Sequence, residues 1–105
     1  TTADAPAYTL DNMTGVREAL PDTPLAILAA ARATTADEFG DRASEAAHTR
    51  YYRELEDSAT ETNTTVFFFE AFDEPWKGNP DNPQGAEKHW GLFFVDRSPK
   101  DVMRR

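Results

Sequence analysis

The pattern of apolar and polar positions first predicts a helix near the start of the chain. Apolar residues recur at helical spacing at four positions: Leu10, Met13, Val16 and Leu20. Asp11 is the expected cap of this helix. Residues 21–24 (PDTP) should end it, because proline cannot continue a helix. Residues 1–8 are expected to be a lead-in to the helix.

A strand, a long helix and a second strand are predicted next. The short apolar run at 25–28 is bounded by turn residues, which is typical of a buried strand. A second helix is expected over about 42–60, because small and apolar residues recur there every four positions: Ala43, Ala47, Tyr51, Leu55 and Ala59. Residues 65–69 are β-branched and aromatic, which favours a strand.

The rest of the chain is expected to be mainly loop. Residues 73–88 contain three of the seven prolines and two of the five glycines. A short extended piece is expected over 90–95, followed by a brief helix capped by Ser98 with Pro99 at its first position. The alternation predicts two neighbouring parallel strands joined by a right-handed crossover. Two such strands do not make a stable sheet with both faces covered, so neighbouring strands should be needed.

Composition excludes several classes of function. With 105 residues the expectation is one domain, and the net charge of −8 would repel nucleic acids and anionic membranes. The absence of cysteine excludes disulfides and thiolate catalysis and leaves the compartment undetermined, with an extracellular or periplasmic place still open. We see no membrane-spanning run and no signal peptide. No cofactor and no metal are expected, since His48 and His89 lack partners at ligand spacing; His48 should lie on a helix surface.

One segment concentrates candidate chemistry. Eight of the twelve aromatic residues, including Trp76 and Trp90, lie between positions 67 and 94, interspersed with carboxylates, a lysine and a histidine. The segment follows the carboxyl end of the second strand, where active sites form in parallel α/β folds. Flat aromatic faces beside carboxylates suit a sugar. We interpret the phenylalanines at 67–69 as core, and Trp76 and Trp90 as candidate sugar-binding residues.

Three stretches in this region carry a family resemblance: residues 69–77 (FEAFDEPWK), 87–93 (EKHWGLF) and 96–100 (DRSPK). In order and spacing they resemble the end of family 17 glycoside hydrolases, the β-1,3-glucanases and related glucanosyltransferases, especially the bacterial and fungal members. A weaker likeness extends upstream to about Val16. The resemblance implies an α/β fold that is a fragment of a (β/α)8 TIM barrel, its last two strand–helix units. Residues 1–105 would then be a single partial domain, the C-terminal portion of the barrel.

The resemblance also implies what this chain lacks. The family's retaining mechanism needs two carboxylates about 5–5.5 Å apart. Its nucleophile is the Glu of a Glu-x-Gly-Trp segment on the penultimate strand, which aligns with Ala29-Ala30-Ala31-Arg32 here. The nucleophile position is therefore Ala29. The family's acid lies in an Asn-Glu pair, and this chain has none, so we expect no catalytic residue in it.

By the same resemblance, six residues are expected to line a cleft for β-glucan or an oligosaccharide: Glu74, Trp76, Lys77, Glu87, Trp90 and Arg32. Glu74, Lys77 and Glu87 match acidic and basic positions of the family's cleft, where an ion-pair network could set protonation. Trp90 could equally pack under the loop.

Arg32 replaces the family's Trp. It is expected beside Glu70, Asp73 and Glu74, where it can pair with a carboxylate and occupy the space of a glucosyl unit.

Three functional interpretations stay open. The first is a piece of a β-1,3-glucan hydrolase or transglucosylase, inactive alone. The second is a non-catalytic glucan-binding remnant or pseudoenzyme. The third is a scaffold that completes a barrel by self-association or with the remaining barrel segment. Because two strands leave edges unpaired, the isolated chain is expected to be oligomeric, marginally stable or partly molten.

Overall fold

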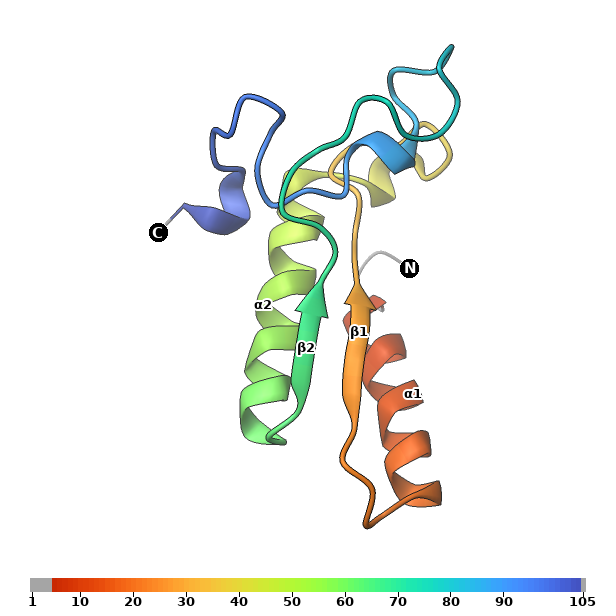
Figure 1. Cartoon of the computed structure of the whole chain (residues 1–105), viewed down its shortest axis with the longest axis vertical. Coiled ribbons are helices and arrows are strands. Elements are labelled where there is room, and N and C mark those ends of the chain that lie inside the picture. Colours follow the sequence, from red (N-terminus) through yellow and green to blue (C-terminus); the bar gives the residue numbers. More distant parts are fainter. Residues whose placement is uncertain (1–4, 105) are drawn as a thin grey trace.

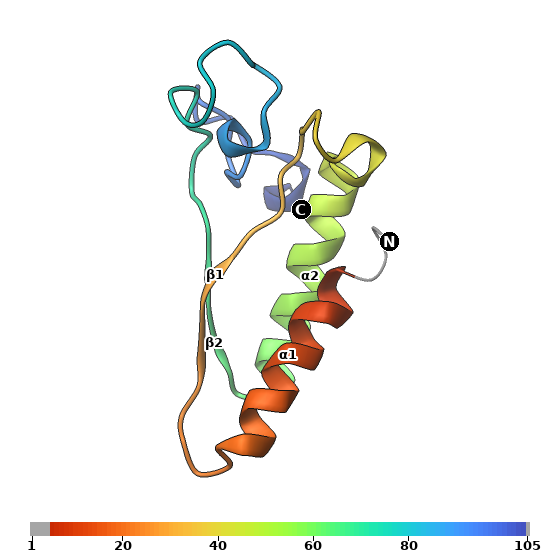
Figure 2. The ribbon, with the colours of Figure 1, turned by 90° about the vertical axis from the view of Figure 1, so that its right-hand side faces the viewer.

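The computed structural model describes residues 5–104. They form two helices and two strands in strict alternation: α1 (Ala5–Ala19), β1 (Ala26–Ala30), α2 (Glu45–Glu61) and β2 (Thr65–Phe68). Three short 3-10 turns follow or interrupt them: η2 (Gly40–Arg42), η3 (Ala86–Lys88) and η4 (Asp101–Met103). Both helices lie on one side of the two-stranded sheet, and the long loops gather at the carboxyl ends of the strands (Figures 1 and 2).

The two strands pair in parallel, as predicted. Ala26 lies opposite Thr65 and Ala30 lies opposite Phe68, with an irregularity between Ile27 and Ala30 where β1 has one more residue than β2. The connection runs through α2 behind the sheet and returns to the neighbouring strand with right-handed sense (Figures 1 and 2). This is the hand that a twisted strand feeding a helix favours.

Helix α1 starts earlier than its apolar spacing suggested. It begins at Ala5, so the lead-in expected over 1–8 is wrong for residues 5–8, and its earlier part lies outside the described residues. Asp11 stands inside the helix and cannot cap it. Pro6 is buried at the second helical position, where a missing N–H costs nothing because the first turn has no internal acceptors.

Helix α2 supplies the side chains that close the core. The Ser44 hydroxyl caps it by accepting a hydrogen bond from the backbone N–H of Ala47 at 3.0 Å. His48, Tyr51 and Leu55 are its buried residues, so the expectation that His48 lies on the surface is wrong. The positions three, four and seven apart form one stripe of the helix, which is why a histidine in register with the apolar residues is buried. Tyr51 and Leu55 pack with Ala30 of β1 as the main core cluster.

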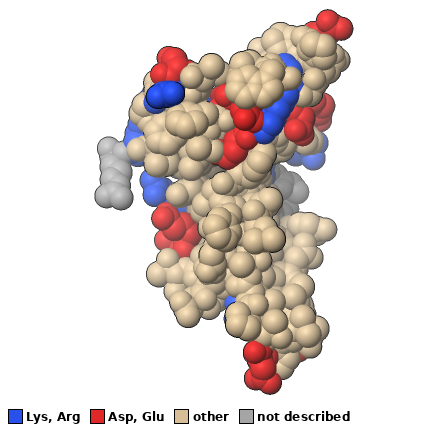
Figure 3. All heavy atoms as spheres, in the orientation of Figure 1, with Lys and Arg blue, Asp and Glu red and all other residues tan. Residues whose placement is uncertain are grey.

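The sheet face opposite the helices is uncovered. Leu28 is 76% exposed, Phe67 56% and Phe69 42%, so the predictions of a buried first strand and of a core position for these phenylalanines are wrong. Of the three phenylalanines at 67–69, only Phe68 packs against the core, and it is half-buried. Figure 3 shows this face largely free of charged side chains. The radius of gyration is 14.6 Å, against about 13 Å for a compact chain of about 100 residues.

The C-terminal part follows the expected course with less regular structure. The extended piece expected over 90–95 makes single bridges, Phe93 pairing with Phe72 and with Pro99, and no strand. The final helix is the 3-10 turn Asp101–Met103, preceded by Lys100 and not by Ser98. Its buried Val102 is tied to α2, since Arg53 Nη2 donates to the Val102 carbonyl at 2.9 Å. In the described residues no helix is both long and apolar enough to cross a membrane.

Candidate functional site

Three loop segments meet at the carboxyl ends of the strands. The Phe69 N–H donates to the Ala30 carbonyl at 2.9 Å, so the chain leaving β2 still lies beside the chain leaving β1, as expected. Leu92 N donates to the Glu70 carbonyl at 2.9 Å, and Thr34 N to the His89 carbonyl at 3.1 Å. The segment around 89–92 is therefore held between the extensions of both strands, and residues far apart in sequence share one edge of the sheet.

A buried ion pair fixes these segments. Lys100 Nζ lies 2.7 Å from Asp73 Oδ1 and donates to the Thr34 hydroxyl at 2.8 Å, and the Lys100 and Asp73 side chains are 1% and 5% exposed. Asp73 Oδ1 also accepts from the Gly91 N–H at 2.9 Å. Burial lowers the pKa of Lys100, while the Asp73 carboxylate opposes that shift by favouring the charged form. Because both side chains are buried, the pair supports the loops from beneath.

No local sequence pattern predicted the buried ion pair of Lys100 and Asp73. Asp73 and Lys100 are 27 residues apart, and Thr34 and Lys100 are 66 apart. Both charged residues fall inside the stretches that carry the family resemblance, which was the one available signal.

A second ion-pair cluster lies at the surface just beyond β2. Lys77 Nζ lies 2.6 Å from Glu70 Oε2 and also pairs with Glu74. Burial raises the pKa of Glu70, with Lys77 opposing and Glu74 adding to the rise. Hydrogen bonding from Lys77 lowers the pKa of Glu74, and the two carboxylates raise the pKa of Lys77. The Lys77 ammonium also lies 4.5 Å from the centroid of the Phe69 ring, a cation–π distance.

The structure thus forms a network of one lysine and two carboxylates, but with a different second carboxylate. Glu70 takes the place expected for Glu87, which is exposed on η3. The side chain of Glu87 instead packs on Gly78, where an added Cβ would lie 2.9 Å from the Glu87 Cβ. Gly78 has φ of +68°, so glycine is required there for conformation as well as for space.

The two tryptophans differ in their surroundings. Trp76 is 72% exposed on the loop that carries the surface ion pairs. Trp90 is half-buried and packs on the small cluster of Ala33, Ala36 and Ala86. Trp76 therefore offers an open aromatic face, whereas Trp90 both supports the loop and lines a pocket.

Arg32 was expected to pair with one of the nearby carboxylates, but in the structure its guanidinium has a different partner. Its Nη2 donates to the Arg42 carbonyl at 2.7 Å, while Glu70 pairs with Lys77 and Asp73 with Lys100. Arg32 instead lines a pocket of about 290 Å³ with Trp90 and Arg42. Its backbone carbonyl accepts from His48 Nδ1 at 2.6 Å, which ties the end of β1 to α2. Burial lowers the pKa of His48 to about 4, so the ring is neutral at pH 7.

The described residues do not assemble a glycosidase pair. Ala29, at the expected nucleophile position, lies exposed within β1 and has no acidic side chain to offer. Glu70 and Glu74 both pair with Lys77, and each carboxylate shifts the pKa of the other. A retaining pair must leave about 5–5.5 Å for the anomeric carbon between the carboxyl groups. Among residues 5–104 no group of three His, Cys, Asp or Glu side chains could hold a metal ion.

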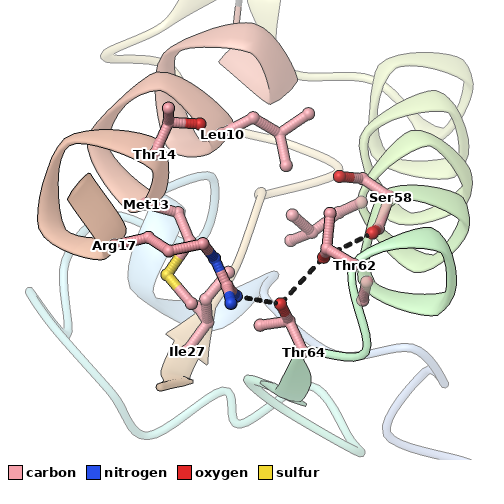
Figure 4. Close-up of a pocket in the computed structure, with 10 residues that line it drawn as sticks. Leu10, Met13, Thr14, Arg17, Ile27, Ser58, Thr62 and Thr64 are labelled. Carbon is pink, nitrogen blue, oxygen red and sulfur yellow. Dashed lines mark hydrogen bonds between the residues drawn. The ribbon is translucent and has the colours of Figure 1, made fainter. Parts of the chain in front are cut away.

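Another pocket lies at the opposite end of the sheet, between α1 and α2 (Figure 4). Arg17 Nη2 donates to the Thr64 hydroxyl at 2.7 Å, and Thr64 and Thr62 hydroxyls lie 2.8 Å apart. Leu10 and Ile27 supply apolar walls. With about 60 Å³ of space, this pocket is far below the roughly 300 Å³ at which ligand pockets begin. It is a packing gap whose polar groups satisfy one another.

Comparison with known sequences finds β-1,3-glucan enzymes over part of the chain. No protein-family model matches. A glucan 1,3-β-glucosidase of Arthroderma benhamiae is 43% identical over 54 residues, which are 49% of this chain and 18% of that protein. A glucan 1,3-β-glucosidase of Saccharomyces cerevisiae is 57% identical over 28 residues, 27% of this chain and 9% of that protein. The chain therefore matches only a small share of the length of these relatives.

Comparison with solved structures covers nearly the whole chain. An active-site mutant of Rhizomucor miehei β-1,3-glucanosyltransferase in complex with laminaritriose matches 97% of this chain with a TM-score of 0.81 and 25% identity. An endo-laminarinase from Formosa Hel1_33_131 matches 98% with a TM-score of 0.80 and 28% identity. A structure of the Rhizomucor miehei enzyme described as glycoside hydrolase family 17 shares the fold at 23% identity. The predicted resemblance is thereby confirmed: the chain is similar to β-1,3-glucan-active enzymes of glycoside hydrolase family 17, and spans 28–36% of the length of their solved structures.

Proposed function

We propose that this chain is the C-terminal part of a β-1,3-glucan-acting glycoside hydrolase or transglucosylase. In this proposal it supplies the last two strand–helix units of a (β/α)8 barrel and one wall of the glucan cleft. Residues 1–105 then act as a single partial domain that is complete only beside the remaining barrel strands.

The observation that carries the proposal is the uncovered sheet face below a rim of aromatic and charged side chains. A lone sheet that exposes Leu28 and Phe67 lacks a partner layer, and barrel strands fill their interior with such side chains. Above that face, Trp76 and the cluster of Glu70, Glu74 and Lys77 stand at the carboxyl ends of the strands. That end is where barrel enzymes bind substrate. The likeness to a glucanosyltransferase whose solved structure is in complex with laminaritriose supports the same class of ligand.

The cleft wall consists of Glu74, Trp76, Lys77, Glu87 and Trp90, with Arg32 at its edge. An exposed indole can stack on the C–H face of a glucosyl unit, and carboxylates accept from its hydroxyls. Lys77 keeps Glu74 ionised by lowering its pKa, so that carboxylate stays an acceptor at pH 7. These residues bind and orient, and none is placed to attack an anomeric carbon.

The chain alone is proposed to be inactive toward glucan. Ala29 occupies the nucleophile position, and the acid of the family's Asn-Glu pair is absent from the sequence. The alternative is a non-catalytic glucan-binding remnant or pseudoenzyme, which the changes at Ala29, Ala31 and Arg32 favour. In either case the uncovered face needs covering, by self-association or by a separate barrel segment.

The test is a binding titration of the pure chain with laminaritriose, followed by tryptophan fluorescence, with maltotriose as the control of equal size and different linkage. We expect a saturable change with laminaritriose only, and its loss in Trp76→Ala. Phe72→Ala is the matched control, since Phe72 is an exposed aromatic residue of the same loop region outside the proposed wall. If Trp76→Ala binds as well as the parent chain, the cleft assignment of this loop is wrong.

A further inference from the structure

The pocket beside the carboxyl end of β1 has a charge opposite to that of the chain. Its volume is about 290 Å³, and its lining consists of Ala5, Ala31, Arg32, Ala33, Phe39, Arg42, Ala43 and Trp90. Among these described residues two are arginines and none is a carboxylate, whereas the chain as a whole carries a net charge of −8. A concave site lined by two arginines and by no described carboxylate concentrates positive potential.

The two guanidinium groups are held in place and keep donors to spare. Arg32 Nη2 donates to the Arg42 carbonyl at 2.7 Å, and Arg42 Nε donates to the Phe39 carbonyl at 3.3 Å. The Arg42 guanidinium also lies 5.6 Å from the centroid of the Phe39 ring. An arginine has five N–H donors, so each has donors left after these contacts. In the part of the chain that the structure describes, the buried Arg32 Nε has no hydrogen-bond partner.

Both arginines would gain from an anion. Burial lowers the pKa of Arg32, and the charge of Arg42 acts in the same direction. Among the acidic residues of the adjoining loop, Glu38 accepts from the Ala86 N–H at 3.2 Å, and Asp41 is exposed on η2. No ion pair of either arginine with a carboxylate occurs within residues 5–104, so the positive charge of the pocket is uncompensated there.

We propose that this pocket binds a carboxylate-bearing pyranose, a uronic acid unit. Its carboxylate would bridge Arg32 and Arg42, because guanidinium groups bind carboxylates with matched, charge-assisted hydrogen bonds. Its ring would lie against the indole of Trp90, which lines the same pocket. The volume is close to the lower end of ligand pockets, about 300 Å³, which suits one sugar unit.

This assignment goes beyond the proposed function, because a neutral β-glucan offers hydroxyl acceptors but no anionic group to balance the charge of two arginines. The pocket shares Arg32 and Trp90 with the proposed cleft wall, but the inference does not depend on Trp76. In this assignment Arg32, which stands at the position of the family's tryptophan, contributes to ligand specificity.

The test compares methyl β-D-glucuronide with methyl β-D-glucoside, which differ only in the carboxylate, by NMR titration of the full chain. The readouts are the indole N–H signal of Trp90 and the Nε–H signals of Arg32 and Arg42. We expect a saturable shift with the glucuronide and little change with the glucoside. Arg42→Gln should raise the Kd at least about tenfold, whereas Arg50→Gln, which removes the same charge from an exposed ion pair on α2, should leave it within about twofold.

Equal shifts with the two glycosides would overturn the proposal, as would equal Kd values for Arg42→Gln and Arg50→Gln. Absence of any saturable shift with the glucuronide would also overturn it. Acetate serves as a third probe: if it binds as tightly as the glucuronide, the pocket is an anion site only and the sugar ring plays no part. Laminaritriose in the same series reports on the cleft through Trp76, so failure of the proposed function and failure of this inference give different results.

Discussion

The buried pair of Lys100 and Asp73 gives the sharpest test of how the loop region is held. Three variants address it: Asp73→Asn, Lys100→Met, and the two combined. Asparagine keeps an acceptor for the Gly91 N–H but leaves the Lys100 charge unpaired. Methionine keeps most of the side-chain length but leaves the Asp73 charge unpaired. The double variant removes both charges and leaves the site neutral.

The magnitude follows from burial. The two side chains are 1% and 5% exposed and 2.7 Å apart, so solvent does little to screen either charge once its partner is gone. Removing one partner of a buried pair costs about 3–5 kcal/mol, while replacing both by apolar groups is often close to neutral. A chain of this length has about 5–15 kcal/mol of stability when complete. Each single variant should therefore lose about a fifth of that or more, and the double variant should recover most of the loss.

The assay is urea unfolding followed by tryptophan fluorescence, because Trp90 reports on the segment that the pair supports. The control is Arg50→Met, which breaks an exposed i,i+4 pair with Glu54 and should cost under about 1 kcal/mol. If either single variant costs no more than this control, the pair does not hold the loops. Strict additivity in the double variant would equally refute the reasoning, since contacting charges must couple.

Four further outcomes are expected. His48 is neutral in the folded chain at pH 7, because burial lowers its pKa to about 4. About 3 kcal/mol of stability should therefore be present above pH 6.5 and be lost as the pH falls towards 4. Urea unfolding at several pH values should show this loss for the parent chain and not for His48→Gln. Ser44→Ala should cost about 1 kcal/mol in the same assay at pH 7, through loss of the α2 cap, and no loss would mean that the cap is not made in solution. Reducing-end assays with laminarin should detect no cleavage, because removal of a nucleophile costs about 10⁶ in turnover in a well-studied protease, and clear activity of homogeneous material would show the carboxylates to be misassigned. Arg32→Trp should strengthen laminaritriose binding in the fluorescence titration by restoring a flat wall, and weaker binding would contradict that role.

The alternation of elements could be predicted from the sequence because each element carries its own local signal. The spacing of four along α2 and the β-branched start of β2 placed both, and parallel pairing followed from their order. The start of α1 was misjudged because Tyr8 is exposed and does not extend the apolar stripe that marked the helix.

Burial could not be predicted in the same way. Apolar content shows that Phe67 can be buried, but not whether a layer exists to cover it, and within residues 5–104 no layer covers it. His48 shows the converse error, since its polar character concealed its place on the buried stripe of α2.

The charged residues of the site were only half predictable. Glu74 and Lys77 are three residues apart and meet without help from the fold. Glu70 replaces Glu87 in their network through a contact seven residues apart in sequence, which residue spacing does not reveal. Arg32 could be placed near the site, but its direction depended on a backbone carbonyl of Arg42, an acceptor that every residue has and that no motif marks.

The uncovered sheet face affects the solubility of the chain. Leu28, Phe67 and Phe69 present an apolar surface on a sheet whose outer edges are unpaired, and shape alone does nothing to keep two such surfaces apart. What opposes their contact is the net charge of −8 spread over the rest of the molecule. That repulsion vanishes near the isoelectric point of about 4.6 and is screened by salt. Solubility of the chain is thus set by the pH and salt of its surroundings, through the same acidic residues that take no part in its core.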